Sequence, residues 1–253
     1  MIDMHTHLDL YPDALQIIDK VNKINIFTLA VTTSPKAWLA TSKVFEKYEN
    51  IHVSVGLHPE IAEAKANEVD LLIDCIKNTN FVGEVGIDGS TRFSKSLPLQ
   101  TSIFKRVLEE CEIQNGKFIS IHSRGAESEV LTLLKNHKNC GTPILHWFSG
   151  KIKELEEAIS LGCWFSINPI MCNSKKGISL ISRIPKNRIL PESDGPFTAV
   201  KNKTIYPWEA INIVNTLEKI WQCNHDDVIY QLKINLNTLL GKNYGEVRNK
   251  HVT

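Results

Sequence analysis

Two histidines separated by one residue, His5 and His7, end a short apolar segment near the start of the chain. Ile2, Met4 and Leu8 are apolar at every second position, a pattern typical of a β-strand. Side chains two residues apart on a strand point to the same side, so both imidazoles can reach one metal ion. Zinc and other borderline metals accept imidazole nitrogen readily. The segment is therefore a candidate metal site; the alternative is two polar residues at a strand end.

Further residues of metal-ligand type lie within or directly after other apolar segments of the chain. They are Glu84, His122, His146 and Asp194. A buried charge is costly unless it is paired or binds a metal, so this recurrence favours a metal centre over a structural role. His58, which precedes a proline, is interpreted as a substrate contact, with helix capping or metal ligation as the alternatives. For Asp88 we expect a structural or helper role.

The candidate ligands outnumber those that one ion uses. A catalytic zinc site keeps three protein ligands and a water, whereas this chain offers four imidazoles and two carboxylates. Two ions about 3.5–4 Å apart can polarise a phosphoryl oxygen, generate hydroxide and stabilise a leaving oxygen. The ligand number therefore predicts two divalent ions, with the central carboxylate of Glu84 able to bridge them.

Eight short apolar segments alternate with longer segments of helical periodicity. The expected strands are residues 2–5, 26–31, 51–56, 81–87, 118–121, 143–146, 164–167 and 188–192. The expected helices are residues 70–77, 100–114, 127–134, 151–161, 210–221 and 226–240. Such alternation implies parallel βαβ units, and eight parallel strands close into a (β/α)8 TIM barrel whose active site lies at the strand ends. We expect one domain over residues 1–253. An open doubly wound sheet is the alternative, disfavoured because no Gly-x-Gly-x-x-Gly loop follows a strand.

Composition narrows the class of protein. The chain has 253 residues, 42% hydrophobic, and a formal net charge of +1, which argues against a strongly basic coat for duplex DNA. Its six cysteines form no Cys-x-x-Cys pair, so we expect reduced thiols rather than a disulfide framework. No signal peptide and no apolar run of about 18 residues is visible, so we expect a cytoplasmic protein without membrane association.

The motifs taken together resemble the TatD family of metal-dependent deoxyribonucleases, which are amidohydrolase-like TIM barrels. In order they are His5-Thr6-His7, Gly56-Leu57-His58-Pro59, Gly83 to Asp88, Gln100 with Phe104, His122-Ser123-Arg124, His146 to Gly150, and Glu192 to Pro196. The resemblance implies that one metal is bound by His5, His7, Glu84 and Asp194, and the second by Glu84, His122 and His146. It implies that Asp194 orients or deprotonates the attacking water, and that His58 and Arg124 contact the scissile phosphate.

The implied activity is 3′→5′ exonuclease cleavage of single-stranded DNA, supported by Mg²⁺, Mn²⁺ or Zn²⁺. Around the metal residues the chain departs from the family pattern, with Gly89-Ser90-Thr91 after Asp88 and Gly125 after Arg124. In this it resembles the TatD-like component of Qat-type anti-phage systems, which implies protein partners from a defence operon. Two alternatives stay open: a hydrolase of a small ester, amide or phosphoester, and a partner-dependent subunit that binds nucleic acid.

Cations and aromatic rings near the strand ends suit a nucleic-acid substrate. Lys201 and Lys203 are candidate contacts to the strand, the alternative being a solvated face. Trp147 and Phe148 are candidate stacking surfaces for bases, the alternative being packing in the core.

Overall fold

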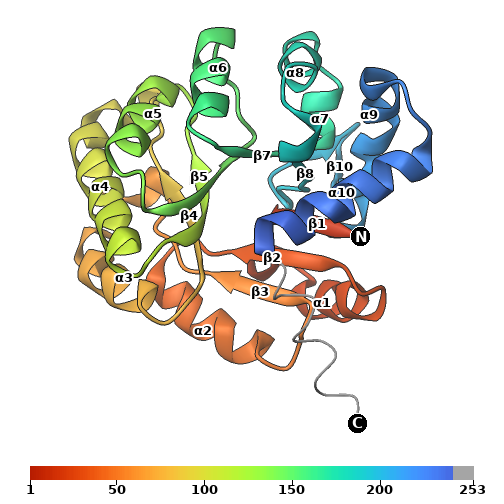
Figure 1. The fold of residues 1–253 in the computed structure, drawn as a ribbon. Coiled ribbons are helices and arrows are strands. Elements are labelled where there is room, and N and C mark those ends of the chain that lie inside the picture. Colours follow the sequence, from red (N-terminus) through yellow and green to blue (C-terminus); the bar gives the residue numbers. More distant parts are fainter. Residues whose placement is uncertain (242–253) are drawn as a thin grey trace.

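The computed structural model of the protein describes residues 1–241 and contains the eight strands of a (β/α)8 barrel, with helices around the outside (Figure 1). The barrel strands are β1 (Ile2–Thr6), β2 (Phe27–Val31), β3 (Ile51–Ser54), β4 (Phe81–Gly86), β5 (Lys117–His122), β6 (Gly141–His146), β7 (Trp164–Ile167) and β8 (Ile189–Pro191). Each expected strand is present, with ends that differ by no more than two residues. The part of the expected domain from 242 to 253 lies outside the described residues.

The strands form two parallel groups, β1-β2-β3 and β4-β5-β6-β7-β8. Between β3 and β4, Val55 N donates to Phe81 O at 3.2 Å and Gly83 N donates to Val55 O at 2.8 Å. Between β8 and β1, Asp194 N donates to His5 O and His7 N donates to Gly195 O, each at 2.8 Å. The hydrogen bonds between β8 and β1 lie at the strand ends that carry His5, His7 and Asp194. Closure of the barrel therefore places these three candidate ligands together.

The expected helices are present at similar positions. The α-helices are α1 (Ala14–Lys23), α2 (Pro35–Phe45), α3 (Val69–Ile76), α4 (Leu97–Ile113), α5 (Glu127–Asn136), α6 (Ile152–Ser160), α7 (Pro169–Cys172), α8 (Lys175–Ile181), α9 (Val214–Trp221) and α10 (His225–Leu240). The 3-10 helices are η1 (Leu8–Leu10), η2 (Pro59–Ile61), η3 (Ala66–Glu68), η4 (Thr91–Ser96), η5 (Lys186–Arg188) and η6 (Pro207–Ile213). The helix expected over 210–221 is divided between η6 and α9. Within residues 1–241, no helix combines the length and the apolar composition needed to cross a membrane.

Four α-helices and a hairpin were not among the expected elements. In α2, Ser34 Oγ accepts from Ala37 N at 3.3 Å and Pro35 takes the first position, a start signal that does not depend on apolar periodicity. The hairpin joins β9 (Ala199–Val200) to β10 (Lys203–Thr204) beyond β8. Its turn residues Lys201 and Asn202 have φ of 50° and 63°, the left-handed values of a tight hairpin turn.

The core lies on both sides of the barrel wall. Every residue of β2 and of β4 is buried, because the strands are covered inside by other strands and outside by helices. Phe104 on α4 and Phe165 on β7 are among the largest fully buried side chains. This packing leaves the polar strand ends as the place where side chains can meet a ligand.

Candidate metal centre

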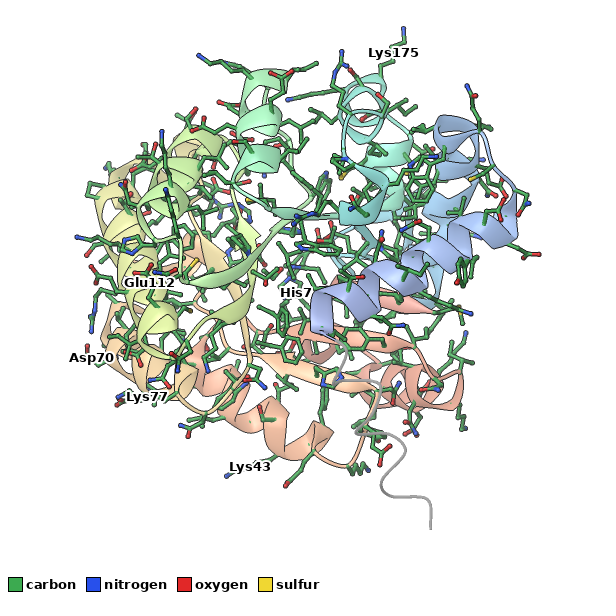
Figure 2. All side chains as sticks on the ribbon, viewed as in Figure 1. His7, Lys43, Asp70, Lys77, Glu112 and Lys175 are labelled. Carbon is green, nitrogen blue, oxygen red and sulfur yellow. The ribbon has the colours of Figure 1, made fainter. Side chains whose placement is uncertain are left out.

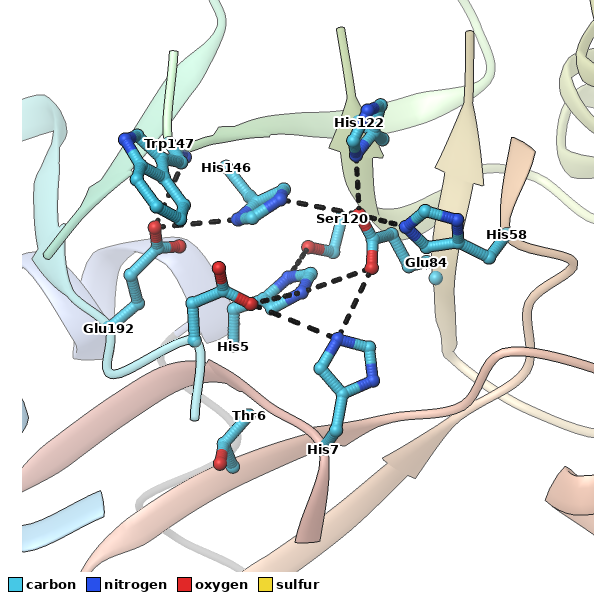
Figure 3. A network of polar contacts seen from close by, with 12 residues as sticks. His5, Thr6, His7, His58, Glu84, Ser120, His122, His146, Trp147 and Glu192 are labelled. Carbon is cyan, nitrogen blue, oxygen red and sulfur yellow. Dashed lines mark hydrogen bonds and ion pairs between the residues drawn. The ribbon is translucent and has the colours of Figure 1, made fainter. Parts of the chain in front are cut away.

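The structure brings the six expected metal ligands together at the carboxyl ends of the strands (Figure 3). They come from β1 and the residue after it, from β4, β5 and β6, and from the segment that follows β8; they are His5, His7, Glu84, His122, His146 and Asp194. A cavity of about 620 Å³ opens over them. His58, Arg124, Trp147 and Phe197 also line it, so both expected phosphate contacts face the same space.

One oxygen of Glu84 faces the two histidines of the first strand. Oε2 lies 3.3 Å from Nε2 of His5 and 3.3 Å from Nε2 of His7. Asp194 Oδ1 lies 3.7 Å and 3.8 Å from the same two nitrogens. Nε2 of His5 is buried and makes no hydrogen bond. Two ligands bound at about 2.0–2.1 Å in tetrahedral geometry stand roughly 3.3–3.4 Å apart, so this set fits a metal ion.

The other oxygen of Glu84 faces three more imidazoles. Oε1 lies 2.8 Å from Nδ1 of His122, 3.2 Å from Nε2 of His58 and 3.3 Å from Nε2 of His146. The two oxygens of Glu84 therefore face separate sets of nitrogens. His58, Glu84 and His122 form a group whose ligand atoms lie close enough to hold a metal ion.

His58 has two roles in the structure. Its Nδ1 accepts a hydrogen bond from Glu60 N at 3.2 Å, which caps η2 as the alternative interpretation of the sequence supposed. Its Nε2 points at Glu84, among the candidate ligands. The side chain, expected as a substrate contact, therefore lines the cavity and also lies within reach of a metal ion.

Burial and neighbouring charges shift the pKa values of three side chains in the site: Glu84, His5 and Asp194. Burial alone would raise the pKa of Glu84, but the surrounding imidazoles, with His58 the strongest, hold it well below its usual value. Burial and the nearby His146 hold the pKa of His5 well below its usual range, so this ring is neutral at pH 7 and can bind a metal. Burial raises the pKa of Asp194 well above its usual range. A bound cation would reverse that rise, because positive charge favours the ionised carboxyl.

Two of the candidate ligand histidines also have a partner at their second nitrogen. Nδ1 of His5 lies 2.8 Å from Ser120 Oγ, and Nε2 of His122 lies 2.8 Å from Asp88 Oδ2. Such partners fix the orientation of a metal-binding imidazole and tune its basicity. The helper role considered for Asp88 agrees with this contact. Ser120 was not a candidate, because a small polar residue inside an apolar strand carries no metal signal in the sequence.

Glu192 plays the same part for His146 and was not a candidate site residue. Its Oε1 lies 3.4 Å from Nδ1 of His146 and accepts from Trp147 N at 3.1 Å and from Asn168 Nδ2 at 3.0 Å. Its Oε2 accepts from Ser166 Oγ. Glu192 is fully buried. The signal that could have identified it in the sequence is an acidic residue at the end of an apolar strand, directly before Ser193 and Asp194, because a carboxylate there is costly without partners.

The backbone at two strand ends is left-handed although neither residue is glycine. Trp147 has φ 40° and Asp194 has φ 51°, conformations that non-glycine residues adopt at some energetic cost, often at functional sites. The turn at Trp147 sends the neighbouring side chains of Trp147 and Phe148 to different places. Phe148 is 2% exposed and packs edge-on against Phe165, so the core interpretation is confirmed for it. Trp147 is half-buried and lines the cavity.

The expected cationic contacts do not all lie at the cavity. Arg124 is exposed and lines it. Lys201 and Lys203 lie on the β9–β10 hairpin and line a different pocket of about 470 Å³. Their role in holding a strand stays a prediction. Figure 2 shows Lys175, the first residue of α8, extended away from the body of the fold.

Comparisons with known proteins agree with the fold and with a metal-dependent hydrolase. The TatD related DNase family matches residues 2–241. A metal-dependent hydrolase of Buchnera aphidicola is 31% identical over 219 residues, covering 78% of this chain and 81% of that protein. Human deoxyribonuclease TATDN3 is 26% identical and covers 82% of each chain. A protein of Rahnella named 3′-5′ ssDNA/RNA exonuclease TatD is 26% identical and covers 73% of each.

Solved structures show the same barrel. The TatD homologue YJJV of Escherichia coli superposes with a TM-score of 0.83 at 20% identity, covering 94% of this chain and 97% of that one. An amidohydrolase of Saccharomyces cerevisiae superposes with a TM-score of 0.78 at 13% identity and also covers 94% of this chain. With a family match that spans nearly the whole described structure, the chain belongs to the TatD-related DNases and is a metal-dependent hydrolase.

Proposed function

We propose that the protein is a deoxyribonuclease that removes nucleotides from the 3′ end of single-stranded DNA and uses two divalent ions. The observation that carries the proposal is the position of Glu84, whose two oxygens face separate groups of imidazoles under one cavity. The name of the Rahnella relative supports the substrate and the polarity.

The residues divide between two ion positions. One ion would be held by His5, His7, Glu84 and Asp194, and the other by Glu84, His122 and His146. Mg²⁺, Mn²⁺ or Zn²⁺ bound there would polarise the phosphoryl oxygen and activate a water at neutral pH.

The remaining chemistry belongs to side chains of the cavity. Asp194 takes the proton of the attacking water, since its carboxyl lines the cavity and lies beside His5 and His7. His58 and Arg124 bind the non-bridging oxygens of the phosphate, because both line the same space and Arg offers several donors to phosphate. The bond from phosphorus to the 3′ oxygen of the preceding nucleotide then breaks.

The test is degradation of a 5′-labelled single strand with Mg²⁺, Mn²⁺ or Zn²⁺, comparing the native protein with Glu84→Gln. We expect a ladder that shortens from the 3′ end, disappears with a chelator, and falls at least about 100-fold in the variant. Glu112→Gln is the matched control. Oε2 of Glu112 lies 3.0 Å from Nδ1 of His137, and this pair does not line the cavity. Intact DNA with every metal, although the native protein binds ions, would contradict the proposal.

A hydrolase of small molecules is the second candidate. A cavity of about 620 Å³ is of the size that takes a small ester, amide or phosphoester. Turnover of such compounds without any cleavage of DNA favours this candidate.

The proposal extends to anti-phage defence beside partner proteins, and that extension rests on the sequence resemblance. Plaque formation on cells that carry the full operon, with native protein or Glu84→Gln, tests it. Free cysteines at all six positions agree with a cytoplasmic site of action.

A further inference from the structure

Phe197 is an exposed aromatic ring at the mouth of the metal cavity. Its side chain is 63% exposed, and it lines the same cavity as His7, Glu84 and Asp194. Residues 1–241 contain other large apolar side chains with comparable exposure, such as Leu15 and Tyr230, but those lie away from this cavity. Single exposed apolar residues are ordinary on a surface. An exposed aromatic side chain at the entrance of a cavity lined by imidazoles and carboxylates indicates a ligand that has an apolar face as well as polar groups.

The segment that carries Phe197 is held in place by its own hydrogen bonds. Phe197 N donates to Asp194 O at 3.1 Å, and Thr198 Oγ1 donates to Ser193 O at 2.6 Å. Gly195 packs so closely on Tyr11 that a Cβ there would stand 1.7 Å from the hydroxyl. The ring is thus presented on a fixed turn, which lowers the entropy lost when a ligand binds.

The ring is also in direct contact with one candidate metal ligand, His7. Its centroid lies 4.9 Å from that of His7, with the two rings at 85°. This edge-to-face contact uses part of the ring and leaves most of the side chain accessible. A planar group that stacks on it stands next to a phosphate bound at the metal centre. Trp147, the other aromatic residue of the cavity, is half-buried and packs against the core, so it offers less accessible surface.

We propose that Phe197 is the stacking surface for the nucleobase next to the scissile phosphate. This inference rests on the proposed function, because it takes a nucleotide as the ligand. An aromatic ring binds any base through its π face, so the contact confers affinity for nucleotides without sequence preference. It makes Phe197 a substrate-positioning residue that the sequence motifs did not indicate.

The test pairs a change in the protein with a change in the substrate. Phe197→Leu removes the aromatic face and keeps apolar bulk, while Phe197→Tyr keeps the face. The substrates are a normal single strand and strands whose 3′-terminal or penultimate nucleotide is an abasic tetrahydrofuran. We expect Phe197→Leu to lower kcat/KM by about 5- to 150-fold on the normal strand, through KM, and to change it little on one of the abasic strands.

Phe197→Tyr is expected to restore most of the activity, and Tyr230→Leu, at a 68% exposed ring elsewhere, to leave it unchanged. An equal loss on normal and both abasic strands overturns the inference, because the ring then acts on the fold of the site and not on a base.

Equilibrium binding separates this inference from the proposed function. Titration calorimetry with dTMP and with deoxyribose 5-phosphate is independent of catalysis. If the native protein cleaves no DNA, a preference for dTMP that Phe197→Leu abolishes still supports the stacking surface. Equal affinity of the native protein for both compounds overturns it.

Discussion

Oδ2 of Asp88 lies 2.8 Å from Nε2 of His122, and the other nitrogen of that ring lies 2.8 Å from Oε1 of Glu84. Asp88 is itself held, because its Oδ1 accepts from Ser90 N at 2.9 Å and its own N donates to Gln100 Oε1 at 2.8 Å. The ring of His122 therefore stands between a fixed carboxylate behind it and the central carboxylate in front. Asp88 acts through His122 and is a positioning residue.

Loss of this positioning carboxylate should weaken metal binding. We expect Asp88→Asn to lower the affinity for the ion that His122 binds by about 10- to 100-fold, because the ring loses its orientation and basicity. Calorimetric titration of metal-free protein with Mn²⁺ measures the effect. Glu112→Gln is the control, because it alters a different His–carboxylate pair, Glu112 and His137, whose atoms lie 3.0 Å apart. This variant should bind Mn²⁺ as the native protein does. Unchanged affinity in Asp88→Asn would show that the contact does not serve a metal.

Metal affinity should rise with pH up to about 9. Burial lowers the pKa of His122, but hydrogen bonds to Asp88 and Glu84 outweigh burial and raise it to about 9 in the metal-free protein. Relative to the usual 6.5, the protonated ring stabilises the metal-free fold fully below pH 6.5, and this contribution is lost as pH rises through 9. A metal needs the neutral ring, so binding below pH 9 displaces a proton.

Loss of the His122 proton should raise the affinity by up to about tenfold per pH unit between pH 7 and 9. Burial lowers the pKa of His146, but Glu192 and Glu84 outweigh burial and hold it well above its usual value, so this ring adds to the pH dependence. Calorimetry in buffers of different ionisation enthalpy measures both the affinity and the protons released. Binding that neither depends on pH nor releases protons contradicts the assignment of His122 as a cation in the metal-free site.

Close packing between β4 and β5 leaves no room for a side chain at Gly86, so a substitution there should destabilise the fold. Gly86 has φ 137°, and a Cβ there would stand 2.0 Å from the backbone oxygen of His122. We expect Gly86→Ala to reduce the free energy of unfolding by roughly 3 kcal/mol or more, because two barrel strands must separate to admit the methyl group. Gly162→Ala is the matched comparison, since φ is 82° there but nothing lies within 4 Å; it should cost about 1 kcal/mol. Urea denaturation of both variants tests the contrast, and equal losses would rule out the steric explanation.

A buried carboxylate paired with a partly exposed lysine, away from the cavity, should make the free energy of unfolding depend on pH. Glu68 is 2% exposed; its carboxylate accepts from Lys65 Nζ at 3.0 Å and from Lys36 N at 3.3 Å. Burial opposes its ionisation, but these hydrogen bonds outweigh burial and hold the pKa below the usual 4.5. The ionised carboxylate therefore stabilises the fold above pH 4.5, and this stabilisation is lost as pH falls through the lower folded value.

We expect Glu68→Gln to lose about 1–2 kcal/mol at pH 7 and progressively less below pH 4.5. Glu63→Gln, at an exposed carboxylate of the same segment, is the control. Chemical denaturation at several pH values gives the comparison. A loss in Glu68→Gln that stays constant down to pH 3 would mean that packing, and not charge, makes the difference.

Much of the barrel could be predicted because its signals are local. A strand such as β7 is a short apolar run, and its ends came within two residues at every barrel position. Helices α1 and α2 were not expected although each lies between expected strands. The buried residues Ile17, Ile18 and Val21 of α1 do form a helical stripe that is visible in the sequence, whereas the buried face of α2 includes the polar Thr41, which interrupts the apolar pattern. Ligand-type residues at strand ends were recognisable for a related reason, since a carboxylate such as Glu84 inside an apolar run is costly without a partner.

The sequence by itself determined the parallel strands, the residue types of the metal centre and the strand ends on which they stand. Only the tertiary structure decided which groups meet. Closure of the barrel places His5 beside Asp194 although 189 positions separate them in the chain, and sets both oxygens of Glu84 against imidazoles from other strands. The left-handed turn at Trp147 likewise decides that Phe148 is buried and Trp147 faces the cavity. These outcomes depend on distances between segments far apart in the sequence, and local patterns of apolar and polar residues do not contain such distances.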